Sequence, residues 1–113
     1  MSEPRLKTKI WVQSAVKRCL SEGVGATVAR KGDEDAGAVA LKLLIVGLGC
    51  EVLTQARNKD GELGWYRASG PNLIPETEAD ALLSREVGYD RDLWIVEIED
   101  HEGRRFFGGE IVE

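Results

Sequence analysis

Two acidic residues, Asp33 and Asp35, lie two positions apart in the glycine-flanked stretch RKGDEDAG, residues 30–37. Carboxylates that converge in a turn can coordinate Mg²⁺ or Ca²⁺. The stretch lacks the longer ligand run and the closing glutamate of an EF-hand loop. Because glycines suit a tight turn and an aspartate there can accept backbone N–H groups, the pattern favours a hairpin turn over a cation site.

The same stretch begins with two cations, Arg30 and Lys31, which precede Gly32. Two cations and the backbone amides of a glycine turn can hold a phosphate. The chain has neither a P-loop nor a dinucleotide-binding motif, and GLG at 47–49 is only a fragment of one. The favoured interpretation is that the acids of the turn screen these cations, in exposed pairs that contribute about 0–1 kcal/mol each.

An aromatic and basic cluster, Trp65, Tyr66 and Arg67, occurs in GWYRASG. Such side chains on an exposed strand can stack on bases or form an interface hot spot. Neighbouring residues of a strand point to opposite faces, so one of the two aromatic rings must face away from the helix-covered side of a sheet. This pattern indicates a partner surface, unless other segments of the chain cover both faces.

Nucleophilic, metal and general acid chemistry have weaker support. No serine lies in a GxSxG motif, and the two cysteines are far apart, with no CxxC or Cys/His cluster. We therefore expect free thiols, no zinc and no cofactor. Burial of Glu97 and Glu99 would raise their pKa values, but acids near the end of a strand more often discourage edge pairing.

The elements that position these residues begin with a helix at 8–22, whose apolar residues recur on one helical face. Thr8 is a suitable N-cap, and Gly23 a suitable residue beyond the end. The alternation in LKTKIWV also allows a short strand at 6–12. A second helix is predicted within PNLIPETEADALLSREVG (71–88): Pro75 suits its first turn, acids near its start complement the helix dipole, and Gly88 ends it.

Five segments show the two-residue period of β-strands, at 24–31, 37–46, 51–58, 63–70 and 92–100. The first two are predicted to form a hairpin through residues 32–36, and the next two a hairpin through the Asp-Gly turn of KDGE. RRFF at 104–107 allows a further short strand. The order α-β-β-β-β-α-β predicts an α+β fold, with an antiparallel sheet of about five strands and both helices packed on one face.

The chain of 113 residues predicts one domain, 1–113, with loose ends at about 1–6 and 108–113. No apolar run is long enough for a membrane span or signal peptide, so we expect a cytoplasmic protein without a membrane partner. The net charge of −5 argues against nucleic acid. The charge is uneven, however, because seven cations gather in the N-terminal third. Apart from Arg5, these are the residues that could contact nucleic acid: Lys7, Lys9, Lys17, Arg18, Arg30 and Lys31.

Four stretches resemble a small bacterial family known only as a domain of unknown function: IWVQSAVKRC (10–19), VARKGDEDAGAVALKL (28–43), ETEADALLSRE (76–86) and DRDLWIVEIEDHEGR (90–104). They include a GD-x-DAG hairpin and a DLW-x-VE-x-ED strand. Members of the family have proline where this chain has Glu34 and Arg91, which affects turn rigidity more than chemistry. The resemblance implies a short cytosolic protein and brings no assigned activity.

We therefore expect a small protein that acts by binding rather than by catalysis. Its expected partner is either another protein or a second copy of itself, which would form a homodimer. The expected binding residues are Arg30, Lys31, Asp33, Asp35, Trp65, Tyr66, Arg67, Asp92 and Trp94. One alternative is a metal-assisted hydrolase or nuclease that uses Asp33, Asp35 and an acid of the last strand. Another is a weak nucleic-acid binder that uses the basic N-terminal helix.

Overall fold

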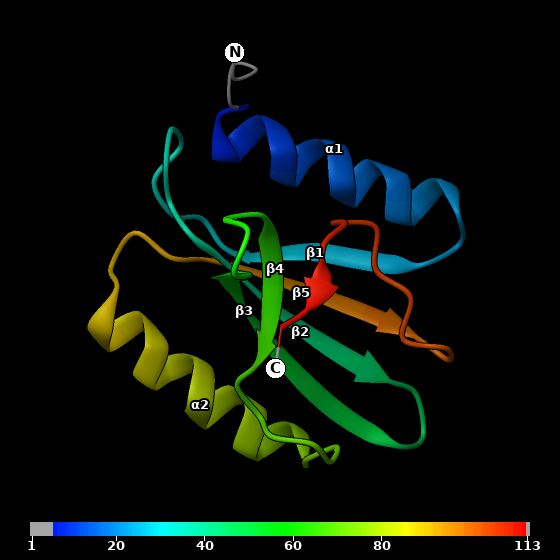
Figure 1. Cartoon of the computed structure of the whole chain (residues 1–113). Helices are drawn as coiled ribbons and strands as arrows, with labels where there is room; N and C mark the ends of the chain where they lie inside the picture. The colour runs from blue at the N-terminus through cyan, green and yellow to red at the C-terminus, as the bar shows by residue number, and fades with distance from the viewer. Residues whose placement is uncertain (1–5, 113) are drawn as a thin grey trace.

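The structure, a computed structural model, describes residues 6–112, which form two helices and six strands (Figure 1). In chain order these are α1 (Thr8–Ser21), β1 (Gly25–Arg30), β2 (Val39–Ile45), β3 (Gly49–Arg57), β4 (Leu63–Arg67), α2 (Glu76–Tyr89), β5 (Trp94–Asp100) and β6 (Glu110–Ile111). The strands form one sheet in the order β1-β5-β2-β3-β4-β6. The β2–β5 and β4–β6 pairs are parallel, so the fold is α+β with a mixed sheet rather than the antiparallel one predicted.

The two helices cover opposite faces of the sheet, with α1 above it and α2 below it in Figure 1. Residues of β2 alternate between the two layers: Leu41 packs in the layer of α1 and Ala40 in the layer of α2. The prediction that both helices pack on one face is therefore wrong. The reason lies in β2, where Val39–Leu43 are all buried, because a strand that is buried on both sides needs cover on both.

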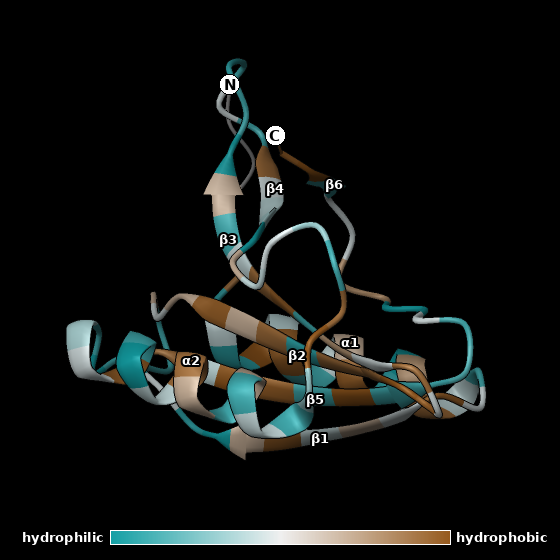
Figure 2. Cartoon of the chain, turned by 90° about the horizontal axis from the view of Figure 1, so that it is seen from below, coloured by the Kyte–Doolittle hydropathy of each residue, from teal (hydrophilic) through white to brown (hydrophobic). Residues whose placement is uncertain are grey.

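β5 lies between β1 and β2, so the predicted hairpin of residues 24–31 and 37–46 is also wrong. β1 pairs antiparallel with one side of β5, and β2 pairs parallel with the other side. Figure 2 shows the apolar strands β2 and β5 in the middle and β1 at the border of the sheet. The most apolar strands take the centre, where β2 is buried on both faces from Val39 to Leu43 and β5 is buried from Trp94 to Val96, and the largely exposed residues of β1 remain at the border.

Several local predictions are confirmed. Residues from Thr8 to Ser21 are helical, which excludes a strand at 6–12, and Gly23 follows the helix with a φ of 77°, a left-handed conformation that glycine adopts easily. α2 forms close to its expected position. β3 and β4 form the predicted hairpin, in which the Asn58 side chain accepts backbone N–H groups of the turn.

The C-terminal segment pairs later than expected. Residues 104–107 form no strand, and β6 pairs with β4 instead, within the range 108–113 for which the sequence predicts a loose end. The other predicted loose end, about 1–6, lies outside the described residues except for Leu6.

The tryptophans belong to the core. Trp65 is fully buried; its ring stacks on Trp11 at 6.1 Å and meets the edge of Phe107 at 6.2 Å, and its indole N–H donates to the Gly108 carbonyl at 2.6 Å. These contacts fix the segment before β6 against the α1 layer. Trp94 is also buried, and its indole N–H donates to the Asp33 carbonyl at 2.7 Å.

The stretch 30–37 is a connection docked on α1 rather than a hairpin turn. Carbonyls of Glu34 and Asp35 accept the first free N–H groups of α1, those of Lys9 and Thr8, at 2.9 and 3.2 Å. Thr8 is not the N-cap, because it lies inside the helix and its hydroxyl donates to the Gly37 carbonyl at 2.8 Å. The connection therefore satisfies backbone groups that a helix N-terminus leaves open.

We predict that Gly32→Ala lowers the free energy of unfolding by about 3 kcal/mol, because its added methyl group overlaps the Asp92 carbonyl and the Trp94 ring. The matched control is Gly88→Ala in α2, where nothing lies within 4 Å and alanine favours the helix by about 0.5–1 kcal/mol. Urea unfolding followed by tryptophan fluorescence measures both. Equal stability of the Gly32 variant and the unchanged protein would contradict this packing.

Candidate functional site

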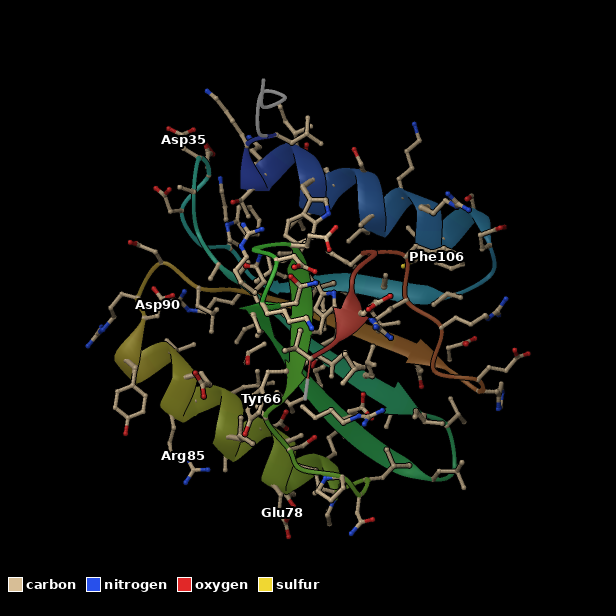
Figure 3. The ribbon with its side chains drawn as sticks, viewed as in Figure 1. Asp35, Tyr66, Glu78, Arg85, Asp90 and Phe106 are labelled. Atoms are coloured by element: carbon tan, nitrogen blue, oxygen red, sulfur yellow. The ribbon has the colours of Figure 1, made fainter. Side chains whose placement is uncertain are left out.

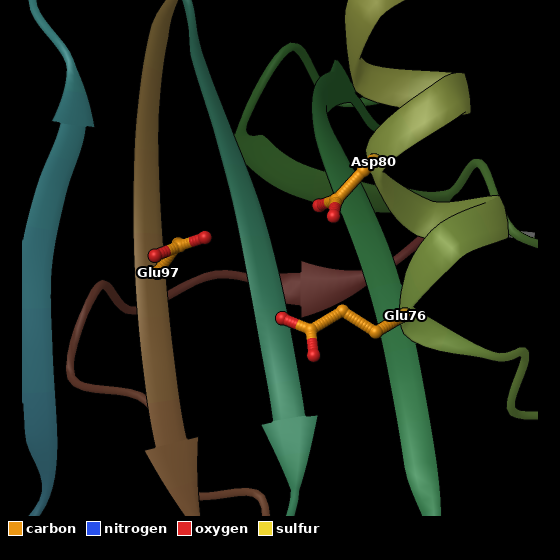
Figure 4. A group of neighbouring side chains, drawn as sticks. All are labelled: Glu76, Asp80 and Glu97. Carbon is orange, nitrogen blue, oxygen red and sulfur yellow. The ribbon is translucent and has the colours of Figure 1, made fainter.

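A buried lysine, Lys42, lies in the middle of β2 on the face covered by α2, with 3% of its surface exposed. Its ammonium contacts three carboxylates: Asp80 at 2.6 Å, Glu76 at 2.7 Å and Glu97 at 3.2 Å. Glu97 is its direct neighbour on β5, and the two other acids lie one turn apart on α2. Figure 4 shows all three acids directed toward β2, so this cluster joins helix and sheet.

The electrostatics of the cluster keep Lys42 charged. Burial alone lowers the pKa of a lysine, but hydrogen bonds to Asp80, Glu76 and Glu97 outweigh that effect and raise the pKa of Lys42 above its usual value. A lysine with a raised pKa does not act as a general base or an amine nucleophile near neutral pH. Lys42 is therefore a fixed cation.

The three carboxylates also have the spacing of a cation site, since one oxygen of each lies within 4.8 Å of the others. Such oxygens suit Mg²⁺ or Ca²⁺. Here each of them is bonded to the Lys42 ammonium, which accounts for their convergence without a metal ion.

A hollow of about 250 Å³ lies beside Lys42, and we name it the acidic groove. Its walls come from β1, β2, β5 and the start of α2, and consist of Gly25, Ala26, Thr27, Lys42, Leu44, Glu76, Glu97, Ile98 and Glu99. The groove is open because α2 packs over β2 and β3 rather than over β1. On the same side of the sheet as α2, β1 carries Gly25 and Thr27. Both are small and exposed, so they leave open space next to their partners on β5.

The groove has an excess of negative charge. Glu76, Asp80 and Glu97 share one ammonium, and about half of each of these side chains remains exposed. Glu99 is also exposed, and within residues 6–112 its carboxylate has neither a hydrogen bond nor an ion pair. Four carboxylates thus face one lysine.

The groove opens at the border of the sheet, along the residues Gly25–Val28 of β1, which we name the β1 edge. These four residues pair in regular register with β5 on one side, and no described strand pairs with the other side. The register shifts only between Val28 and Arg30. The Arg30 guanidinium then turns back to donate to the Leu93 carbonyl at 2.6 Å.

The predicted site residues of the 30–37 stretch serve the fold. One carboxylate oxygen of Asp33 accepts the Ala36 N–H at 2.8 Å, and its backbone N–H donates to the carbonyl of Asp92 at 3.0 Å. Lys31 pairs with Glu34 at 2.9 Å, so the predicted screening within this stretch is confirmed for this cation. Two acids of this stretch also pair with cations at the start of α1: Glu34 pairs with Lys9 inside the helix, and Asp35 pairs with Lys7 just before it.

The predicted aromatic residues do not share one surface. Trp65 and Trp94 are buried, whereas Tyr66 is 57% exposed and is the ring that faces outward. Arg67 lies 3.6 Å from the Glu51 carboxylate. Figure 3 shows Tyr66 well separated from Asp35, so the structure does not bring the predicted residues together into one site.

The acids of the metal-dependent alternative also stay apart. Among the described residues, the acids close enough to share a cation are Glu76, Asp80 and Glu97, and neither Asp33 nor Asp35 belongs to this group. The expected convergence of those two aspartates with an acid of β5 is therefore not found in this part of the chain.

Sequence reasoning missed Lys42, Glu76 and Asp80 as members of a site. The available signal is the lone charge in AVALKLLIV, since a lysine inside a strand buried on both faces must have carboxylate partners. Its partners on α2 gave no such signal, because acids in a first helical turn are common for reasons of the dipole alone.

Comparisons with known proteins agree on one family. Residues 6–108 match the family described as "Protein of unknown function (DUF1491)". A crystal structure of a DUF1491 family protein from Caulobacter crescentus CB15 is 39% identical, with a TM-score of 0.83 over 96% of this chain and 100% of that one. An NMR structure of a DUF1491 family protein from the same organism is 36% identical, with a TM-score of 0.82 over 98% of this chain and 100% of that one.

A solution structure of a protein from A. tumefaciens is 29% identical, with a TM-score of 0.72 over 85% of this chain and 86% of that one. No curated protein matches the chain. Among the described residues, neither helix has the length and apolar character needed to cross a membrane.

We predict that Lys42→Met lowers the free energy of unfolding by about 3 kcal/mol, because three carboxylates then face one another without a cation. This is the low end for a broken buried pair, since the carboxylates are half exposed and regain water. The matched control is Lys59→Met in the exposed β3–β4 turn, where we expect a change within about 0.5 kcal/mol. Urea unfolding measures both.

The pH dependence follows from the raised pKa of Lys42. A group whose pKa is higher in the folded state contributes fully below its unfolded value, which is 10.5 for lysine, and loses the contribution only above it. The difference between the unchanged protein and Lys42→Met is therefore expected to stay constant from pH 7 to pH 9. A difference that disappears within that range would contradict a permanently charged Lys42.

Proposed function

Because the chain belongs to the DUF1491 family, whose function is unknown, we propose a function from its open surface: it is a non-catalytic protein-interaction module. Its binding surface is the β1 edge together with the acidic groove. The occupant is an extended segment of another protein, which adds as a strand beside β1. The observation that carries this proposal is the regular outer side of Gly25–Val28, with which no described strand pairs.

The β1 edge offers what strand addition needs. The outer side of a border strand presents backbone N–H and C=O groups that bind a partner strand, and proteins usually block such edges with charges, proline or bulges. Here the sequence Gly-Ala-Thr-Val contains neither a charge nor a proline. The bulge and Arg30 come only at the end of the strand.

A binding role also fits the chemistry of the described residues. Lys42 is held as a cation by its carboxylates. Cys19 and Cys50 are both buried, and burial raises the pKa of each thiol, so neither is a ready nucleophile at neutral pH. The groove thus has charge to recognise a partner, without an activated nucleophile or base.

Charge favours another protein over a second copy of this chain. Pairing of two β1 edges would bring two acidic grooves to the same side of one continuous sheet. The single cation of β1, Arg30, is bonded to the Leu93 carbonyl of its own chain and so is engaged already. Apart from Arg30, a second β1 offers only uncharged residues to the groove.

Strand addition is tested with capped seven-residue peptides in which valine alternates with lysine, glutamine or glutamate. We expect at least one of them to slow hydrogen exchange of the Gly25–Val28 amides, measured by NMR, with no such effect at β6. Two further versions of the binding peptide are N-methylated, one at odd and one at even positions. A strand bonds through one of its edges only, so one version should bind and the other should not.

The proposal fails if no peptide protects Gly25–Val28, or if both N-methylated versions bind equally well. Self-association through β1, measured by sedimentation of the protein alone, would instead identify a second copy as the occupant.

A further inference from the structure

We propose that the segment that binds the β1 edge alternates apolar and basic residues, and that its lysine or arginine side chains enter the acidic groove. This inference rests on the proposed function, because it gives the side-chain chemistry of the same occupant. Its support comes from the spacing of the strands, the charge of the groove and the two different sides of β1.

The spacing of the strands suits long cationic side chains. A strand added to β1 lies two strand spacings from β5, about 10 Å. Between them lies β1, whose residues on this face are Gly25, without a side chain, and Thr27, with a short one. A lysine or arginine from the added strand can therefore extend over Gly25 and Thr27 toward the carboxylates of Glu99 and Glu97, their direct partners on β5.

The charge of the groove selects cations. Glu99 has no side-chain partner within the described residues, and Glu97 shares the Lys42 ammonium with two other acids. A basic side chain in the hollow would neutralise Glu99 and use the free carboxylate oxygen of Glu97. Arginine suits this place best, because its planar group can bond a carboxylate through two N–H groups.

The opposite side of β1 selects apolar residues. Ala26 and Val28 point to the α1 layer, where Ala26 packs against the core and Val28 is 38% exposed. Residues of the added strand that point to this side would cover Val28 and extend the apolar layer. Because side chains of a strand alternate, a single segment presents basic residues to the groove and apolar residues to Val28.

The test compares the dissociation constants of the valine–lysine, valine–glutamine and valine–glutamate peptides by NMR titration at low salt. We expect the lysine peptide to bind about tenfold more tightly than the glutamine peptide, because two or three partly exposed ion pairs contribute a few tenths to 1 kcal/mol each. The glutamate peptide should bind most weakly. An arginine version should bind at least as tightly as the lysine peptide.

The double variant Glu97→Gln/Glu99→Gln should lose most of the preference for lysine, while binding of the glutamine peptide changes little. The matched control is Glu62→Gln/Glu110→Gln, which changes the net charge equally at exposed positions near the other end of the sheet and should keep the preference. Urea unfolding confirms that each variant is folded. A lost preference in both double variants would show a general charge effect and overturn the inference.

The remaining outcomes separate the inference from the proposed function. If the glutamine peptide protects Gly25–Val28 and binds as tightly as the lysine peptide, strand addition stands and the basic partner is wrong. If the lysine peptide binds elsewhere and no peptide protects these amides, both are wrong.

Discussion

The contact between the Lys42 ammonium and three carboxylates sets the arrangement of the α2 face. A lysine on a central strand that is buried on both sides cannot remain without acidic partners. Two of those partners are supplied by the first turns of α2, which fixes where the helix begins relative to β2. Because α2 is held over β2 and β3, it does not cover the side of β1 that carries Gly25 and Thr27, or the neighbouring part of β5 at Glu97–Glu99. The acidic groove is therefore a consequence of where this ion-pair cluster holds the helix.

The other face of the sheet is closed by different means. α1 packs its buried residues on the sheet, and its N-terminus is satisfied by carbonyls of the 30–37 connection. Trp94 bonds to the same connection, and Trp65 holds the C-terminal segment near β6. The charged residues of this connection, which first suggested a site for chemistry, thus contribute contacts that hold α1 on the sheet. The surface proposed for a partner lies at the opposite face, along β1.

Much of the local structure could be predicted from the sequence, because local patterns determine it. The helical period identified α1, and the Asp-Gly turn identified the β3–β4 hairpin. The position of β5 between β1 and β2 could not be predicted in this way, because alternation marks a strand but not its neighbours. The burial of β2 on both faces is visible in the sequence as the nearly continuous apolar run AVALKLLIV. Such a run is typical of a strand covered on both sides, although the prediction placed both helices on one face. The candidate site depends on this unpredicted topology: Glu97 reaches Lys42 only because β5 pairs with β2.

The central claim is that the β1 edge accepts a strand from another protein, with basic residues over the acidic groove. The most direct measurement is the set of intermolecular NOEs between the valine–lysine peptide and the isotope-labelled protein. Strand addition predicts backbone contacts between the peptide and Ala26 to Val28, together with lysine side-chain contacts near Thr27. Contacts confined to the outer surface of α2 or to the β3–β4 hairpin, with none to the β1 backbone, would contradict the account.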